Sequence, residues 1–415
     1  MELAVGVAVS LAVIILAWTV SVRSGMLTVS RFVAPRPVPA ASLGIALTPA
    51  ATGLHQQLRI ADLHCDAVAW TRNLTRRSNW GHLDFPRMLE GNCAVQLFLT
   101  VTEFPRQIVG DNLTDTSDRL TLLGILEQWP LAAIRDQTER ALYLGGKLKR
   151  YCARTAGSVR FVTTAGELAR ALDDRIADPK VRATVLGLES SDGSKYSLEN
   201  IKRLFAAGYR SSQLCHFTDS PFAASATGVS KGGLTPLGRD AIALMNELGM
   251  IVDLAHAAPR VIEDVLAWSK RAPFFSHTGA RAMENDPKCQ RDELLRAVVD
   301  KGGVVGLCFV EDYIGGARID DIVRSLEHLF RVLGPKGIAL GSGFDSFTIP
   351  ISVDQLSYLT QALLSAGLDA TAIKAIMGEN AIRFLLQELP QGSREDAGAE
   401  ASFLSPLKPT CIEAG

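Results

Sequence analysis

The stretch Leu58-Arg59-Ile60-Ala61-Asp62-Leu63-His64-Cys65-Asp66 is an apolar run that ends in two potential metal ligands. On a β-strand, residues two positions apart point to the same face, so His64 and Asp66 are expected to aim at one point. The same arrangement returns where residues 249–255 lead to His256 and where residues 272–276 lead to His277. Three apolar runs that each end in an imidazole predict strands gathered around a shared metal centre.

From about residue 58 onward, short apolar runs alternate with amphipathic stretches. Eight runs are predicted as strands, over 58–65, 93–101, 183–189, 211–216, 249–255, 272–277, 303–309 and 337–343. Alternation of strands with helices is typical of a parallel sheet. Eight repeats favour an α/β fold that closes into a (β/α)8 TIM-like barrel over an open doubly wound sheet. The segment 105–180 is too long for one crossover and is predicted to add helices over 117–128 and 131–151.

Length and composition are those of a single large domain with a full core. The chain has 415 residues, of which 47% are hydrophobic and 21% charged, and an α/β barrel often uses about 250 residues or more. Its 43 basic and 44 acidic residues leave a net charge of −1, which argues against a nucleic-acid partner. The seven cysteines are scattered and odd in number, so we expect buried, reduced thiols.

The two ends of the chain differ from this central domain. Residues 3–22 carry no charge, and about 20 apolar residues span a bilayer. A cleaved signal peptide is the alternative, but Glu2 stands where a basic segment should be. We expect residues 1–22 to be a single-pass transmembrane anchor, 23–56 a linker, 57–390 the barrel and 391–415 a mobile tail. Arginines at 23, 31 and 36 favour a cytoplasmic barrel by the positive-inside rule, while the side of the membrane stays open.

Further polar residues end other predicted strands, and barrel enzymes carry their chemistry at these carboxyl ends. Glu189 ends the third run and His216 the fourth. A single histidine is more often a core or surface residue, but four at equivalent positions beside a carboxylate pair favour a metal centre. Imidazole and carboxylate ligands suit zinc and other first-row metals. Glu189 is predicted to bridge two ions, with a helix cap or an ion pair as its alternative role.

Ordered motifs over about residues 59–387 resemble the membrane dipeptidases, the renal-type zinc dipeptidases of the amidohydrolase superfamily. The matching stretches are Asp62-Leu63-His64-Cys65-Asp66, Gly81-His82-Leu83-Asp84-Phe85-Pro86-Arg87, Gly187-Leu188-Glu189, Leu214-Cys215-His216, Gly232-Gly233-Leu234-Thr235-Pro236-Leu237-Gly238, Asp253-Leu254-Ala255-His256 and Phe275-Ser276-His277-Thr278-Gly279-Ala280-Arg281. The resemblance implies a zinc-dependent dipeptidase with two zinc ions and a bridging hydroxide as nucleophile. It also allows a homodimer, although no segment of the sequence marks a dimer surface.

The resemblance carries roles onto individual residues. His64 and Asp66 would bind one zinc ion, His256 and His277 would bind the other, and Glu189 would bridge the two. His216 would bind the substrate and steady the negative charge that develops on the scissile carbonyl oxygen, where a fixed donor contributes a few kcal/mol. These are the metal-binding and catalytic residues that the sequence predicts.

Two positions depart from the family pattern. Lys288 stands where the family has an arginine that clamps the substrate carboxylate; it keeps the charge without the planar fork, and its alternative is an ordinary solvated lysine. Gly343, in Gly341-Ser342-Gly343-Phe344-Asp345, stands where the family has an aspartate that carries a proton. Losing such a group typically costs about 10²–10⁴-fold in rate. Asp345 and Asp192 are the nearby carboxylates that could replace it.

These departures leave a second reading open beside the dipeptidase. The chain could be a zinc-binding relative with lost or redirected activity, either a pseudoenzyme or a hydrolase of another small amide or a lactone. Leaving groups that need no protonation would tolerate the absence of an acid at Gly343.

Overall fold

The computed structural model describes residues 28–392, and a ring of parallel strands forms its centre. The ring runs in the order β6-β5-β4-β2-β1-β9-β8-β7. Its strands are β1 (Ile60–Asp62), β2 (Cys93–Val101), β4 (Arg182–Glu189), β5 (Tyr209–Gln213), β6 (Ile251–Asp253), β7 (Phe275–Thr278), β8 (Val305–Leu307) and β9 (Ile338–Leu340). Each of these eight strands overlaps one of the eight predicted runs. The α/β fold with a parallel sheet is therefore confirmed.

The ends of this strand order, β6 and β7, meet through one residue. The Phe274 N–H donates to the Val252 carbonyl at 3.2 Å, and the Phe274 carbonyl accepts from the Leu254 N–H at 2.8 Å. These bonds close the ring into the arrangement of a TIM-like barrel. Every strand of the ring is buried on both faces, which explains the apolar runs in the sequence. In β2, for example, Leu97 and Phe98 pack into different core clusters.

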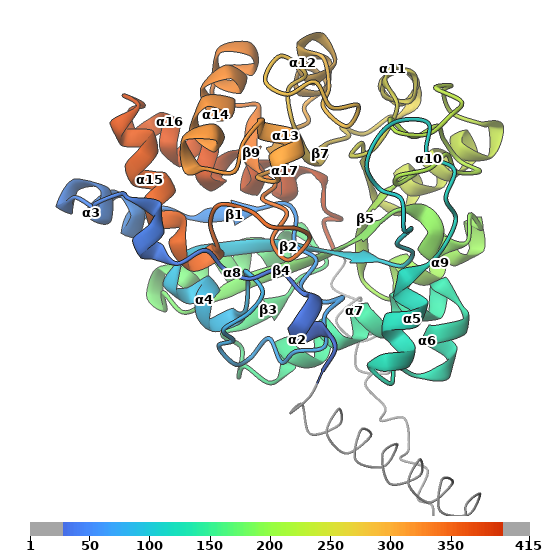
Figure 1. Cartoon of the computed structure of the whole chain (residues 1–415), viewed down its shortest axis with the longest axis horizontal. Helices are drawn as coiled ribbons and strands as arrows, with labels where there is room; N and C mark the ends of the chain where they lie inside the picture. The colour runs from blue at the N-terminus through green and yellow to red at the C-terminus, as the bar shows by residue number, and fades with distance from the viewer. Residues whose placement is uncertain (1–27, 393–415) are drawn as a thin grey trace, which may run out of the picture.

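Helices surround the strands (Figure 1). They are α4 (Phe85–Glu90), α5 (Arg119–Leu126), α6 (Leu131–Arg135), α7 (Gln137–Ala153), α8 (Ala165–Ala177), α9 (Leu198–Ala206), α10 (Pro236–Leu248), α11 (Pro259–Trp268), α12 (Asp292–Asp300), α13 (Glu311–Ile314), α14 (Ile319–Leu333), α15 (Leu356–Ser365), α16 (Ala370–Lys374) and α17 (Asn380–Glu388). The sequence did not predict α8, which begins at a capping box of Thr164 and Glu167. It also missed β3 (Val159–Phe161), a short strand that pairs with the beginning of β4 outside the ring.

The expectation of a linker over 23–56 is wrong for the part that the structure describes. Helix α3 (Pro49–Gln57) lies beside α15 (Figure 1), where the His55 Nδ1 is 2.9 Å from the Thr360 hydroxyl. Further upstream, α2 (Ser30–Val33) is held by a 2.6 Å hydrogen bond from the Ser30 N–H to Glu127. The Gly81 N–H donates to the Pro35 carbonyl at 2.7 Å. This segment is thus part of the folded domain.

Some predictions fall on residues beyond this range. The expected anchor at 1–22 and nearly all of the expected mobile tail lie outside the described residues, so both stay predictions. Between residues 28 and 392, no helix combines the length and apolar character needed to cross a bilayer. The six cysteines within the same range are buried and unpaired, as expected.

Candidate metal centre

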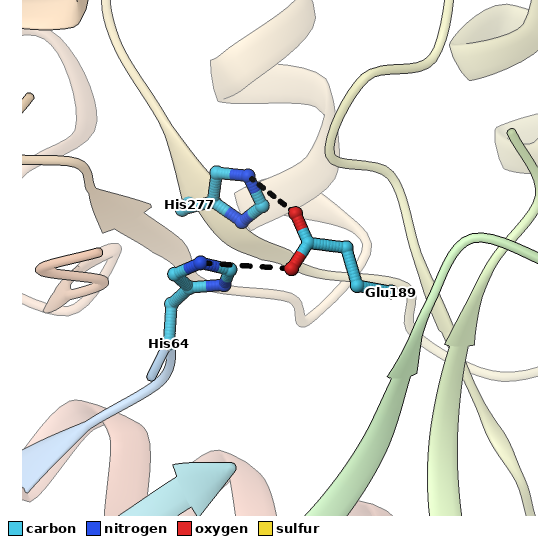
Figure 2. A group of neighbouring side chains, drawn as sticks. All are labelled: His64, Glu189 and His277. Atoms are coloured by element: carbon cyan, nitrogen blue, oxygen red, sulfur yellow. Dashed lines mark ion pairs between the residues drawn. The ribbon is translucent and has the colours of Figure 1, made fainter. Parts of the chain in front are cut away.

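Glu189, the last residue of β4, lies at the centre of the predicted site. Its Oε2 is 3.7 Å from the His64 Nε2, and its Oε1 is 3.8 Å from the His277 Nε2. Figure 2 shows these two imidazoles, from the ends of β1 and β7, each facing one oxygen of the carboxylate. The same Oε1 is 3.4 Å from the His216 Nε2 and 3.6 Å from the His256 Nε2. Four histidines predicted from separate strand ends therefore meet at one carboxylate.

The distances fit metal ligation. Two nitrogens that each lie about 2.0–2.1 Å from one zinc ion can be at most about 4.2 Å apart, and the Nε2 atoms of His256 and His277 are 3.0 Å apart. Several buried atoms of the cluster have no hydrogen-bond partner within the described residues, among them the Glu189 Oε2 and the Asp66 Oδ1. Buried polar atoms are normally paired, so these atoms are suited to an ion.

The residues group around Glu189 in two sets. His64, Glu189 and His277 bring their ligand atoms within 4.8 Å of one another, and so do Glu189, His216 and His256. Asp66 adjoins the first set, with its Oδ2 3.4 Å from the His64 Nε2. The resemblance paired His277 with His256 instead, and it kept His216 for the substrate. Both arrangements share Glu189, whose Oε2 contacts His64 while its Oε1 contacts the other three imidazoles.

Electrostatics prepare these groups for a cation. Burial opposes charge on Glu189, but the positive charge of His64 and the contacts of His216 and His256 outweigh it and hold its pKa well below the usual range. Burial, reinforced by the neighbouring His216, lowers the pKa of His256 to about 3. Burial and the charge of His64 likewise hold the pKa of His277 well below its usual value. Neutral imidazole is the form that binds a metal.

At His64 and Asp66 the pKa values are raised instead. Burial opposes protonation of His64, but the negative charges of Glu189 and Asp66 prevail and raise its pKa to about 9. Burial together with repulsion from Glu189 raises the pKa of Asp66 to about 7. An ion that bound here would displace these protons, since metal ligands must be deprotonated.

Two buried aspartates position the strand ends that carry the ligands. Asp62 accepts hydrogen bonds from the His64 N–H at 3.1 Å and from the Ser342 N–H at 2.8 Å, which ties β1 to the segment after β9. Asp253 accepts from the Ser276 N–H at 2.9 Å and so ties β6 to β7. Both residues stand in the sequence motifs that precede the histidines, and no role was predicted for them. The signal was an aspartate inside a predicted apolar run, two or three residues before a histidine.

Three residues other than glycine near the centre adopt left-handed backbone conformations. The φ angles are 76° at Ser190, 64° at His256 and 68° at Asp345. Such conformations cost roughly 1–3 kcal/mol each and persist only where the surrounding structure enforces them. All three directly follow or belong to strand-end segments of the cluster, so the chain is turned sharply where the ligands are presented.

At the end of β9, no carboxylate replaces the family's proton carrier. Gly343 has a φ of 75°, and a Cβ added there would lie 3.1 Å from the Ser346 hydroxyl and 3.3 Å from the Cys308 sulfur. Asp345 is fully buried and accepts hydrogen bonds from Arg72 at 2.5 Å and from the His82 N–H at 2.9 Å. The Asp345 carboxylate is therefore a structural ion pair and not a free acid.

Lys288 is neither solvated nor free. Its side chain is 5% exposed, and its Nζ donates to Asp286 at 3.2 Å and to Asp312 at 3.1 Å. The ammonium also lies 5.5 Å from the centroid of the Tyr313 ring, and Tyr313 in turn contacts His277. Tyr313 thus links Lys288 to the centre, but two carboxylates already neutralise the charge of this lysine.

His216 connects the centre to a cavity of about 260 Å³. Its ring packs on Phe217 with a centroid distance of 4.0 Å, and both residues line the cavity. Asp192, considered above as a replacement acid, lies in the same wall, where it accepts hydrogen bonds from the hydroxyls of Ser190 and Tyr196. The cavity is therefore the space in which a ligand would reach the cluster.

Comparison with known proteins adds a family to this geometry. Residues 49–395 match the family described as membrane dipeptidase, peptidase family M19. An uncharacterized dipeptidase of Schizosaccharomyces pombe is 30% identical over 275 residues, which cover 64% of this chain and 61% of the yeast protein. The chain thus matches less than two thirds of that relative's length.

Solved structures share the fold. A metallopeptidase of family M19 named dipeptidase AC superposes with a TM-score of 0.66 at 21% identity, over 81% of this chain and all of that chain (100%). A metallopeptidase of Rhodobacter sphaeroides, solved with a phosphinate mimic of the dipeptide L-Ala-D-Ala, gives a TM-score of 0.66 at 21% identity over 80% of this chain and 99% of the other.

Proposed function

This chain belongs to the membrane dipeptidase family, peptidase family M19, and from that premise we propose that it is a metal-dependent dipeptidase with a dinuclear zinc centre. The observation that carries the proposal is the position of Glu189, since its Oε2 contacts the imidazole of His64 and its Oε1 contacts that of His216. A carboxylate shared in this way can hold two ions about 3.5–4 Å apart. When bound, the ions would polarise the scissile carbonyl and lower the pKa of a water held between them.

The residues of the chain supply ligation and orientation. His64, Asp66, His256 and His277 hold the ions with Glu189, and the buried aspartates behind them keep the strand ends in register. His216 lies between the cluster and the cavity, where its imidazole can orient the substrate oxygen on which negative charge develops. A fixed donor at that oxygen contributes about 3–4 kcal/mol in other hydrolases.

A specific observation favours a second candidate, a hydrolase turned to a substrate that needs no acid. Gly343 offers no carboxyl group, Asp345 is bound to Arg72, and Lys288 is bound to two aspartates. The leaving group of a lactone or of an activated amide would need no protonation by the protein. Such a substrate would also not require a carboxylate clamp. A zinc-binding relative without activity is the limit of this candidate.

The proposal is tested with Glu189→Gln, which keeps the shape of the side chain and removes the shared charge. The wild-type protein is expected to bind two zinc ions per chain and to hydrolyse dipeptides. The variant should lose at least one ion, measured by elemental analysis after dialysis, and roughly 10²-fold or more in rate. Glu199→Gln, on the exposed face of α9, is the matched control. Two tightly bound ions without hydrolysis of any dipeptide would favour the second candidate, and zinc binding unchanged in the variant would reject the centre.

A further inference from the structure

The cavity beside His216 is lined by four carboxylates and by no lysine or arginine. Its lining residues are Glu103, Pro105, Asp115, Thr116, Asp192, Tyr196, His216, Phe217, Thr218, Asp219 and Pro221. Because like charges gathered in a concave site raise the local concentration of counter-ions, this composition points to the charge of the ligand. His216 supplies a second observation: it is 7% exposed, and its Nδ1 has no hydrogen-bond partner within the described residues.

Two of the four carboxylates are engaged in holding loops. Asp219 accepts hydrogen bonds from the backbone N–H groups of Ser225 at 2.9 Å and Ser230 at 2.7 Å. Asp115 accepts from the N–H groups of Gln107 at 2.9 Å and Ser117 at 2.8 Å. Their charges are compensated by backbone donors, and their orientation is fixed by the loops themselves.

The other two carboxylates, Glu103 and Asp192, repel each other. Asp192 accepts hydrogen bonds from hydroxyl groups and forms no ion pair with any residue between 28 and 392. Arg140, whose charge also acts on Glu103, donates to Asp118 at 2.7 Å and to backbone carbonyls. Burial, with repulsion from Asp192 and Asp118, raises the pKa of Glu103 to about 7. This repulsion shows that the two carboxylates lie close together, and no lysine or arginine lines the cavity to balance them.

The wall also has an apolar part. Phe217, Pro105 and Pro221 line the same cavity as the carboxylates. A lysine or arginine side chain has matching parts, since its alkyl stem packs on apolar surface while its charged end stays with polar groups. An aromatic ring adds attraction for a cation that lies over its face. The volume of about 260 Å³ suits one side chain and not a large ligand.

We propose that this cavity is a specificity subsite that accepts a basic side chain of the dipeptide substrate, with Glu103 and Asp192 binding its cationic end. The inference rests on the proposed function, because it names the substrate class of the same site. It assigns selectivity to carboxylates in the cavity wall, while Lys288, the residue expected to bind a substrate carboxylate, is neutralised by its own neighbours.

The test compares lysine with norleucine, which has the same carbon chain and lacks the amine. Zinc-loaded full-length protein is assayed with Lys-Ala against Nle-Ala, and with Ala-Lys against Ala-Nle. We expect a preference of about tenfold or more in kcat/KM for lysine at one of the two positions, as a charged hydrogen bond is worth about 1.5–3 kcal/mol. The preference should fall toward one in Glu103→Gln combined with Asp192→Asn, and it should persist in Glu199→Gln.

Dissociation constants of the same four dipeptides, from titration calorimetry, separate this inference from the proposed function. Hydrolysis of all four at equal kcat/KM would leave the dipeptidase standing and overturn the basic subsite. Tighter binding of a lysine dipeptide without hydrolysis of any would support the subsite and count against the peptidase. Equal affinities, absence of binding, or a preference that survives the double substitution would each overturn the subsite.

Discussion

Two regions of the site differ in how closely they keep the family's pattern. The metal half consists of the strand ends that carry the expected ligands, and the substrate half consists of the segments beyond the strands that are expected to bind the substrate. At the ends of β1, β4, β6 and β7, each expected ligand is present, and each carboxylate oxygen of Glu189 contacts an imidazole. At the end of β9, glycine replaces an acid at Gly343, and after β7 the cation of Lys288 is bound to two aspartates. The metal half is thus kept while the substrate half has changed.

The difference reflects where each half gets its geometry. Ligands at strand ends are positioned by the barrel itself, through backbone pairing and through Asp62 and Asp253. Substrate groups lie in the segments beyond the strands, which can change without disturbing the ring. A chain can therefore retain metal chemistry and alter its substrate, and the following predictions test that separation.

The largest effect is expected from Asp345→Ala, because it leaves the Arg72 guanidinium buried and unpaired. Breaking a buried ion pair costs roughly 3–5 kcal/mol, so the free energy of unfolding, measured with urea, should fall by about that amount. Glu379→Ala, which breaks an exposed pair with Arg59, should cost less than about 1 kcal/mol. A stable variant that loses only catalytic rate would show that Asp345 acts as an acid. The substrate half would then keep the family's chemistry as the metal half does.

The next effect concerns the support behind the ligands. Asp62→Asn and Asp253→Asn each replace a carboxylate that accepts backbone hydrogen bonds at a strand end, and partners behind metal ligands are typically worth about 10–100-fold in metal affinity. Zinc titration against a competing chelator should show a loss of that size for both variants. The exposed Asp174→Asn should bind zinc like the wild type. Unchanged affinity in both variants would mean that the strand ends hold their geometry without them.

Substituting Gly343 tests the substrate half directly. Its left-handed backbone strains any side chain by roughly 1–2 kcal/mol, and Asp and Asn share this strain equally well. If an acid is what the β9 end lacks, Gly343→Asp should hydrolyse dipeptides at least about tenfold faster than Gly343→Asn. Equal rates in the two variants would show that proton transfer at this position does not limit the reaction.

The smallest effect is a pH dependence of substrate preference. Burial, with the charges of Asp192 and Asp118, raises the pKa of Glu103 to about 7, against a counteracting Arg140. A carboxyl group with a raised pKa is charged above that value and loses its charge as the pH falls through it, so the preference for Lys-Ala over Nle-Ala should be stronger at pH 8 than at pH 5.5. Glu103→Gln should flatten the dependence. A preference that grows toward acid would exclude Glu103 as its source.

Much of the fold could be predicted because the strands of this barrel are buried on both faces. Runs such as 93–101 are apolar at all positions but Gln96 and Thr100 and stand out from amphipathic helices. The strand β3 has three residues and only one buried side chain, so no periodicity marks it. Helix α3 was hidden in a segment rich in proline and alanine, although Thr48 followed by Pro49 is a cap signal that could have revealed it.

The candidate site was predictable to the same extent as its backbone. Histidines that end parallel strands must meet at one end of the barrel, so the gathering around Glu189 follows from position alone. The state of Lys288 does not follow, because Asp312 reaches it from α13, a helix 24 residues further along the chain. The loss of Asp345 as a replacement acid likewise depends on Arg72, which lies 273 residues away in the sequence.

The segment that leads into α3 has a practical consequence for how this protein can be shortened. A chain cut at the predicted boundary, residue 57, would remove the Pro35 carbonyl that Gly81 uses, the Ser30 hydroxyl that the Thr71 N–H uses at 3.1 Å, and the His55 contact to α15. Thr71 and Gly81 flank Arg72, the partner of Asp345. Trimming the amino-terminal end would thus loosen the segment around Arg72. A loss of activity in such a fragment could then be mistaken for a property of the intact protein.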